Sequence, residues 1–142
     1  MYNYVFFARC LMTRKEAREQ AFILLFQNTF KNEDFEELVE TEKENGAYVE
    51  DEYCSSCVKT AIEHSEEITD LIVKYAKGWK IDRISKVAVS ALRLAICEIK
   101  YFDDIPAAVS VNEAVELTKK YATEDDSSFV NGILGSVIRA ED

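Results

Sequence analysis

Cysteines and a single histidine are the residues of this chain whose types could support metal or redox chemistry. Cys54 and Cys57 form one CxxC pair. A structural zinc site needs four ligands, and no second pair follows at the spacing of a zinc ribbon or finger. His64 and Cys97 could complete a site only if folding happened to bring them together, and no strand–helix pattern indicates a thioredoxin-like motif. We therefore expect no metal, redox centre or other cofactor.

Groups that could act as nucleophile and base are equally scarce. With one histidine in the sequence, no Ser/His/Asp or Cys/His set can be assembled unless His64 supplies the base. There is no phosphate-binding loop, since Gly132-Ile133-Leu134-Gly135 lies inside a helical pattern and is interpreted as close helix packing. The sequence thus predicts a binding protein, not an enzyme.

Three basic residues, Arg14, Lys15 and Arg18, cluster in the first turns of a helix predicted from Thr13 to Phe30. Thr13 and Glu16 have the spacing of a capping box, which marks the start of that helix. The positive end of a helix dipole favours acidic side chains, so a basic first turn departs from a local rule. It is either a solvated charged surface or a phosphate site, to which the free helix amides would contribute.

Negative charge is concentrated in one region, although the whole chain carries −10. The segment 33–67 holds 13 acidic residues against Lys43 and Lys59, and the other 107 residues sum to about +1. A local basic patch at the start of the chain is therefore compatible with RNA binding. The acidic segment is interpreted as a soluble surface or as a docking surface for a basic partner such as a ribosomal protein.

Apolar residues recur at helical spacing throughout, and no strand pattern is present. We expect an all-α fold of about six or seven helices, arranged around a central helix from Ile84 to Tyr101 that is apolar on several sides. Pro106 should end that helix, Ser110 to Glu113 should cap the next one, and the polar elbow Asp125–Ser128 should cap the last.

The run IPAAVSVNEAVELTKKYATEDDSSFVNGILG, preceded by Trp79, Arg83 and ALRLAICEI, resembles the NusB family of bacterial transcription antitermination factors, and so does the opening TRKEAREQAFILLFQ. The similarity covers residues 12–139. It implies two small helical bundles packed together. It also implies binding of boxA-type single-stranded RNA from ribosomal RNA leaders, jointly with the ribosomal protein NusE, and read-through by RNA polymerase in a complex with other Nus factors.

The same resemblance assigns roles to six residues of this sequence. Arg14, Lys15 and Arg18 would contact phosphates, and Phe129 would stack on an unpaired base. Asp125 would hydrogen bond to base edges or amides, and Phe26 would lie near the RNA and partner surfaces. For Phe129, a core aromatic at the start of the last helix remains the alternative. The interleaved Glu16 and Glu19 depart from the more arginine-rich family pattern, so RNA affinity without the partner should be weak.

Two other functions are left open. One is a scaffold that binds a basic protein through its acidic surface and never touches RNA, and the other is an accessory ribosomal-RNA-binding domain like those fused to some methyltransferases. Residues 1–11 are expected to be a disordered or non-native extension before a helical domain at 12–142. Free thiols and the lack of a secretory signal or apolar span favour the cytoplasm and no membrane partner. Both a monomer and a homodimer are compatible with the sequence.

Overall fold

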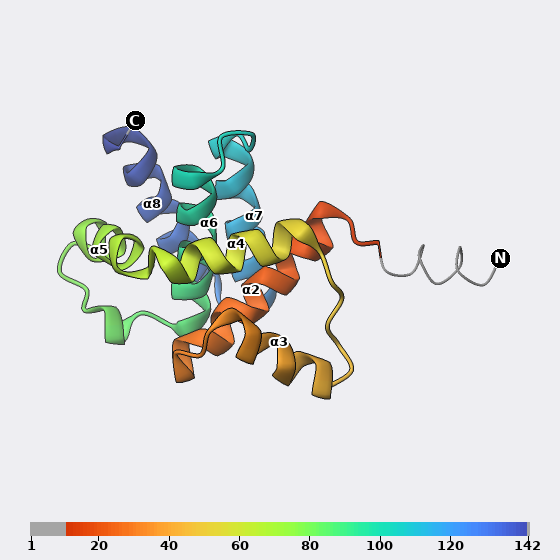
Figure 1. Ribbon diagram of the computed structural model, residues 1–142. Coiled ribbons are helices and arrows are strands. Elements are labelled where there is room, and N and C mark those ends of the chain that lie inside the picture. The colour runs from red at the N-terminus through yellow and green to blue at the C-terminus, as the bar shows by residue number, and fades with distance from the viewer. Residues whose placement is uncertain (1–10, 142) are drawn as a thin grey trace.

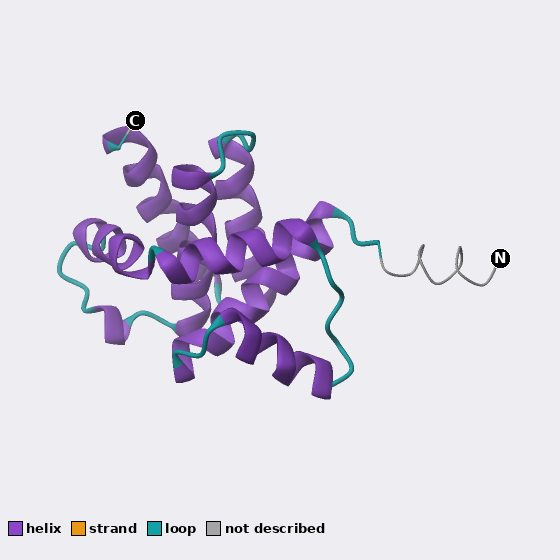
Figure 2. Cartoon of the chain, in the orientation of Figure 1, coloured by secondary structure: helices purple, strands orange, loops and turns teal. Residues whose placement is uncertain are grey.

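The computed structural model describes residues 11–141, and the prediction for the N-terminal extension falls on residues that lie, apart from Leu11, outside this range. The described residues form seven α-helices and no strand, which confirms the all-α prediction (Figures 1 and 2). The helices are α2 (Arg14–Lys31), α3 (Phe35–Glu44), α4 (Glu52–Glu63), α5 (Ser65–Tyr75), α6 (Lys86–Tyr101), α7 (Ala107–Tyr121) and α8 (Glu124–Ala140), with a 3-10 turn η1 (Ile81–Arg83). None of these helices is long and apolar enough to span a membrane.

Helix α6 is the centre of the fold, as its pattern predicts. It packs against α2, α4, α5, α7 and α8, and its side chains from Ala88 to Glu98 are all buried. Small residues such as Ala88, Ala91 and Ala95 allow neighbouring helices to approach closely on several sides. Around α6, the helices α7 and α8 complete one bundle and α2, α3 and α4 form the other (Figure 1).

Local capping fixes where α2 begins. Thr13 accepts a hydrogen bond from the amide of Glu16, and the Glu16 carboxylate accepts one from the amide of Thr13. The two backbone amides, which have no partner within the helix, are both hydrogen bonded in this way, so the predicted capping box is confirmed. The helix ends at Asn32, which has the left-handed φ of 50° that asparagine tolerates.

The predicted start of α7 is wrong by one turn. The helix begins at Ala107, because Pro106 needs no amide partner at the helix start and its carbonyl accepts from the amide of Val109. Ser110 therefore lies inside the helix, and its side chain is buried. The predicted capping box of Ser110 and Glu113 does not form, and Ser110 has another role.

The predicted polar elbow at Asp125–Ser128 is also corrected. Helix α8 begins at Glu124, and Thr123 is its N-cap, with its hydroxyl accepting from the amide of Asp126 at 3.1 Å. Acidic residues 124–126 thus occupy the first turn of α8, where they face the positive end of the helix dipole. A further boundary that the sequence leaves open, between α4 and α5, falls at His64.

Candidate nucleic-acid interface

A buried carboxylate lies beneath the start of α2. Glu98 of α6 is 0% exposed and accepts hydrogen bonds from three helices. Arg18 of α2 donates through Nε to Oε2 at 2.8 Å, Tyr53 of α4 donates its hydroxyl to the same oxygen, and Ser110 of α7 donates to Oε1 at 2.8 Å. We call Arg18, Tyr53, Glu98 and Ser110 the Glu98 cluster. It joins the two bundles at one point.

Arg18 belongs to the interior and not to the open surface. It is 4% exposed, whereas the sequence predicts a phosphate contact at this position. Burial alone would lower the pKa of Arg18, but its hydrogen bond and charge interaction with Glu98 outweigh burial and raise that pKa. The guanidinium is therefore permanently charged, and its charge is compensated by a buried partner.

Arg14 and Lys15, one turn earlier, are exposed. The Arg14 guanidinium carbon lies 4.3 Å from the centroid of the Tyr53 ring, a cation–π distance. Arg14 and Tyr53, but not Lys15, line a hollow of about 470 Å³ together with Met12, Phe102 and acidic residues at the start of α4 and in the loop before α7. Arg14 and Lys15 can contact a ligand because their side chains already lie at the surface, whereas Arg18 is buried.

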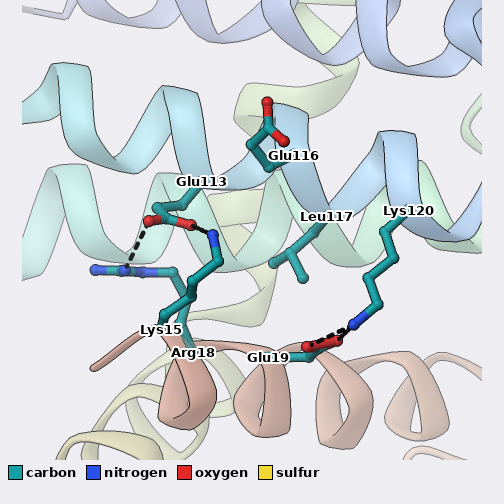
Figure 3. A pocket seen from close by; sticks show the side chains of 7 residues that line it. All are labelled: Lys15, Arg18, Glu19, Glu113, Glu116, Leu117 and Lys120. Atoms are coloured by element: carbon teal, nitrogen blue, oxygen red, sulfur yellow. Dashed lines mark hydrogen bonds and ion pairs between the residues drawn. The ribbon is translucent and has the colours of Figure 1, made fainter. Parts of the chain in front are cut away.

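Lys15 and Lys120 are held by acids across the boundary between α2 and α7 (Figure 3). Lys15 Nζ lies 3.3 Å from Glu113 Oε2, and Lys120 Nζ lies 2.6 Å from Glu19 Oε2. We call these two ion pairs the charge clasp. They border a small hollow of about 150 Å³, and the side chain of Lys15 is still 72% exposed.

The pKa of Glu19 is lowered by its neighbours in the charge clasp. A hydrogen bond from Lys120 is the largest cause that lowers the pKa of Glu19, and one from the hydroxyl of Tyr121 adds to it. Lys120 and Tyr121 donate to the same carboxylate, and the Tyr121 ring packs on Phe22 at a centroid distance of 5.3 Å. The last turn of α7 is therefore fastened to the middle of α2.

Asp125 and Phe129 meet in a third hollow, of about 380 Å³, at the start of α8. Phe129 is half-buried, and its ring contacts Trp79 edge to face at 6.0 Å, while Trp79 itself is 59% exposed. Arg83 and Ser85 line the same hollow. Aromatic edges, a guanidinium and a carboxylate in one open hollow are the groups that bind an unstacked nucleobase.

Phe26 stands apart from the other five predicted residues. It lies 12 residues after Arg14, roughly 18 Å along the axis of α2. Its ring contacts Phe30 edge to face at 5.1 Å, and Phe30 is 60% exposed. The two phenylalanines form an apolar patch at the far end of the helix, separate from the basic first turn.

Two further predictions concern the thiols and the acids. Cys54, Cys57 and Cys97 are all buried and free, and no group of three metal-ligating side chains occurs within residues 11–141. Burial raises the pKa of the Cys54 thiol to about 11, which makes it unreactive at neutral pH. Most of the acids of segment 33–67 lie exposed on α3, on the loop after it and on α4.

The sequence did not indicate that Tyr53 and Glu98 together organise this site. Tyr53 reads as one apolar position of α4, and Glu98 reads as a charged interruption of the central helix. The signal for Glu98 is present in its setting, because an acid in a helix that is apolar on all sides must find buried donors. Trp79 and Arg83 stood out in the sequence only as part of the family pattern.

Comparison with known proteins agrees with these features. The family model described as "NusB family" matches residues 15–139. A transcription antitermination protein NusB from Natranaerobius thermophilus is 43% identical over 131 residues, covering 89% of this chain and 94% of that protein. The NusB protein of Clostridium botulinum strain Hall is 41% identical and is covered over its full length.

A solved structure gives the same result. A chain of the crystal structure of antitermination factors NusB and NusE in complex with dsRNA superposes with a TM-score of 0.78 at 35% identity, covering 89% of this chain and 96% of that one. These proteins are transcription antitermination factors and not enzymes, which agrees with the prediction of a binding protein. The chain described here belongs to the NusB family.

Proposed function

We propose that this protein is a transcription antitermination factor that binds boxA-type single-stranded RNA of ribosomal RNA leaders together with NusE, a small-subunit ribosomal protein, and promotes read-through by RNA polymerase. The observation that carries the proposal is the solved relative in which NusB and NusE are in complex with dsRNA. Other Nus factors would link the complex to the polymerase. The helical domain at 12–142 is proposed as the RNA-binding unit.

The proposed RNA path follows α7, from the basic side chains beside this helix to the hollow at the start of α8. Lys15 lies beside Glu113 in the first half of this helix, and Lys120 lies near its end, roughly 11 Å farther along the axis. The chain then turns into α8, where Asp125 and Phe129 line the nucleobase-sized hollow. Phosphates would contact Arg14 and Lys15, and a base would stack beside Phe129 and Trp79.

Within this proposal Arg18 has a supporting role. Its guanidinium is bound to Glu98 and buried, so it would act on phosphates through the position of α2 and through its charge. Asp125 is exposed and would accept from base edges, whereas Phe26, with Phe30, would serve the partner surface. Two exposed phosphate contacts predict a log–log salt slope of about −1.4 for the protein alone.

The test is fluorescence anisotropy of a short labelled leader RNA, with a scrambled RNA of equal length as control, in the presence and absence of NusE. We expect tighter binding of the leader sequence, strengthened by the partner, and a loss with Phe129→Leu. Equal weak binding of both RNAs, unchanged by NusE, would contradict the proposal. That outcome would favour a scaffold that holds a basic protein on the acidic α3 surface.

A further inference from the structure

We propose that Tyr53 is a positioning residue for RNA binding: its ring, held by Glu98, fixes the guanidinium of Arg14 at the start of α2. This inference rests on the proposed function, which supplies RNA phosphate as the ligand of Arg14; the inference adds only the residue that positions the Arg14 side chain. Arg14 is exposed, yet it lies over a ring that belongs to a different helix and to the buried interior.

The Tyr53 ring is fixed from several sides. Its hydroxyl donates to Glu98, its ring forms an edge-to-face pair with Phe102 at a centroid distance of 6.0 Å, and the Arg18 guanidinium lies 5.5 Å from its centroid. The residue is 9% exposed. A ring held in one orientation restricts the Arg14 side chain to fewer conformations in the free protein. Arg14 therefore loses less conformational entropy when it binds phosphate.

The support differs in kind from that of Lys15. Lys15 is paired with Glu113, a carboxylate that competes with phosphate for the same ammonium group. The Tyr53 ring carries no charge, since burial, the neighbouring Cys57 and Glu98 keep its pKa raised and its hydroxyl protonated. No hydrogen bond from Arg14 to Tyr53 accompanies this contact, so the N–H donors of the guanidinium stay available to phosphate oxygens.

Arg14 forms no ion pair with an acid among the described residues. The ion pairs formed within residues 11–141 include Lys15, Arg18, Lys74, Lys119 and Lys120, but none includes Arg14. Asp51, Glu52 and Asp104 line the same hollow without reaching ion-pair distance. The Tyr53 ring is therefore the feature of the described structure that orients this cation.

A double-mutant cycle tests whether Tyr53 acts through Arg14. The RNA affinities of Arg14→Ala, Tyr53→Leu and the double variant are measured with the anisotropy assay, in the presence of NusE. Tyr53→Leu should weaken binding about two- to fivefold in the native background, the range of an exposed cation–π contact. It should have almost no effect once Arg14 is alanine, because the supported group is gone. A merely structural role for Tyr53 would give losses that multiply, and that result would overturn the inference.

Two matched variants separate ring from hydroxyl. Tyr53→Phe keeps the ring under Arg14 and should retain most of the RNA affinity, even though the hydrogen bond to Glu98 is lost. Tyr75→Phe removes an exposed tyrosine hydroxyl that donates to Glu141 at 2.6 Å, away from this site, and should leave RNA binding unchanged. A loss with Tyr53→Phe equal to that of Tyr53→Leu would contradict the role of the ring.

An NMR measurement on the unsubstituted free protein, combined with the RNA-binding assay, distinguishes failure of the Tyr53 positioning role from failure of the proposed RNA-binding function. In the NMR spectrum of the free protein, the δ protons of Arg14 should be shifted upfield by the ring current of Tyr53, relative to those of exposed Arg139. Normal Arg14 shifts together with intact RNA binding would overturn the positioning role alone. Upfield shifts in a protein that binds no RNA would refute the proposed function and, with it, the RNA role given to Tyr53.

Discussion

Two sets of charges hold α2 against its neighbours, and they differ in almost every physical respect. The Glu98 cluster is buried, and its carboxylate is shared by donors from three helices. The charge clasp consists of two ion pairs at the surface, each with a largely exposed lysine. Arg18 takes part in the first set and Lys15 in the second, although they are three residues apart.

The difference indicates which charges are structural and which can be exchanged. Removing one partner of a buried pair leaves an uncompensated charge in a medium that solvates it poorly. A surface pair loses little when one partner leaves, because water and salt replace it. We therefore expect the Glu98 cluster to set the geometry and the charge clasp to open for phosphates.

The strongest test of this contrast is Glu98→Gln. The substitution keeps the shape but removes the charge that balances Arg18, and we expect the free energy of unfolding to fall by about 3–5 kcal/mol. Urea denaturation followed by circular dichroism measures the change. Glu67→Gln is the matched control, since Glu67 also accepts from a tyrosine hydroxyl, that of Tyr101, but at the surface. A loss below about 1 kcal/mol for Glu98→Gln would place the cluster among ordinary surface pairs.

A smaller loss should follow from Ser110→Ala. The serine hydroxyl is a neutral donor to Glu98, and its removal leaves the ion pair with Arg18 in place. We expect a decrease of about 1 kcal/mol in the free energy of unfolding, the usual value for one hydrogen bond. Ser136→Ala, which removes an exposed hydroxyl that donates to the carbonyl of Gly132, is the control. No difference between the two variants would show that Ser110 does not stabilise the cluster.

The contrast between buried and exposed charge could not be read from the sequence. Periodicity predicted α2 and the central position of α6, because apolar spacing and the Thr13–Glu16 capping box are local signals. Arg14, Lys15 and Arg18 looked equivalent there, since each is a basic residue in the same two turns. Their environments are set by α4, α6 and α7, which are distant in sequence.

The errors at α7 and α8 have the same origin. Ser110 and Glu113 match a capping box by spacing, but a proline four residues before the expected N-cap Ser110 can itself begin the helix. Ser110 was then free to turn inward to Glu98, a contact that no local pattern encodes. By contrast, Asp125 and Phe129 lie together as one would expect for residues four apart on a helix.

If the charge clasp opens for RNA, removing one of its acids should strengthen binding. Glu113→Gln frees Lys15 from its partner at 3.3 Å and removes a negative charge near the proposed phosphate path. We expect a gain in RNA affinity of about two- to fivefold, the equivalent of a surface ion pair, at low salt. The gain should shrink as salt is raised. Glu116→Gln is the control on the same helix, because Glu116 pairs with Lys119 and not with Lys15.

An unchanged or weaker affinity of Glu113→Gln would indicate a different role for Glu113. Its other oxygen lies 3.8 Å from Arg18 Nη1, so it also touches the Glu98 cluster. A drop in stability with no gain in affinity would then assign Glu113 to the buried set of charges and move the boundary between the two sets.

The smallest expected effect concerns the pH dependence of the clasp at Glu19. Hydrogen bonds from Lys120 and then Tyr121 lower the pKa of Glu19 below its ordinary value of 4.5. A carboxylate with a lowered folded-state pKa stabilises the fold above its unfolded-state pKa, and this contribution disappears as the pH falls through the folded-state value. Lys120→Met should lower the free energy of unfolding slightly at pH 7 and leave it almost unchanged well below pH 4, because solvent screens an exposed ion pair. Urea unfolding at both pH values measures the difference, and Lys119→Met, whose partner Glu116 is a helical neighbour, is the control. An equal loss at both pH values would mean that Lys120 stabilises α7 by packing along Tyr121 and not by its charge, which would remove this pair from the clasp.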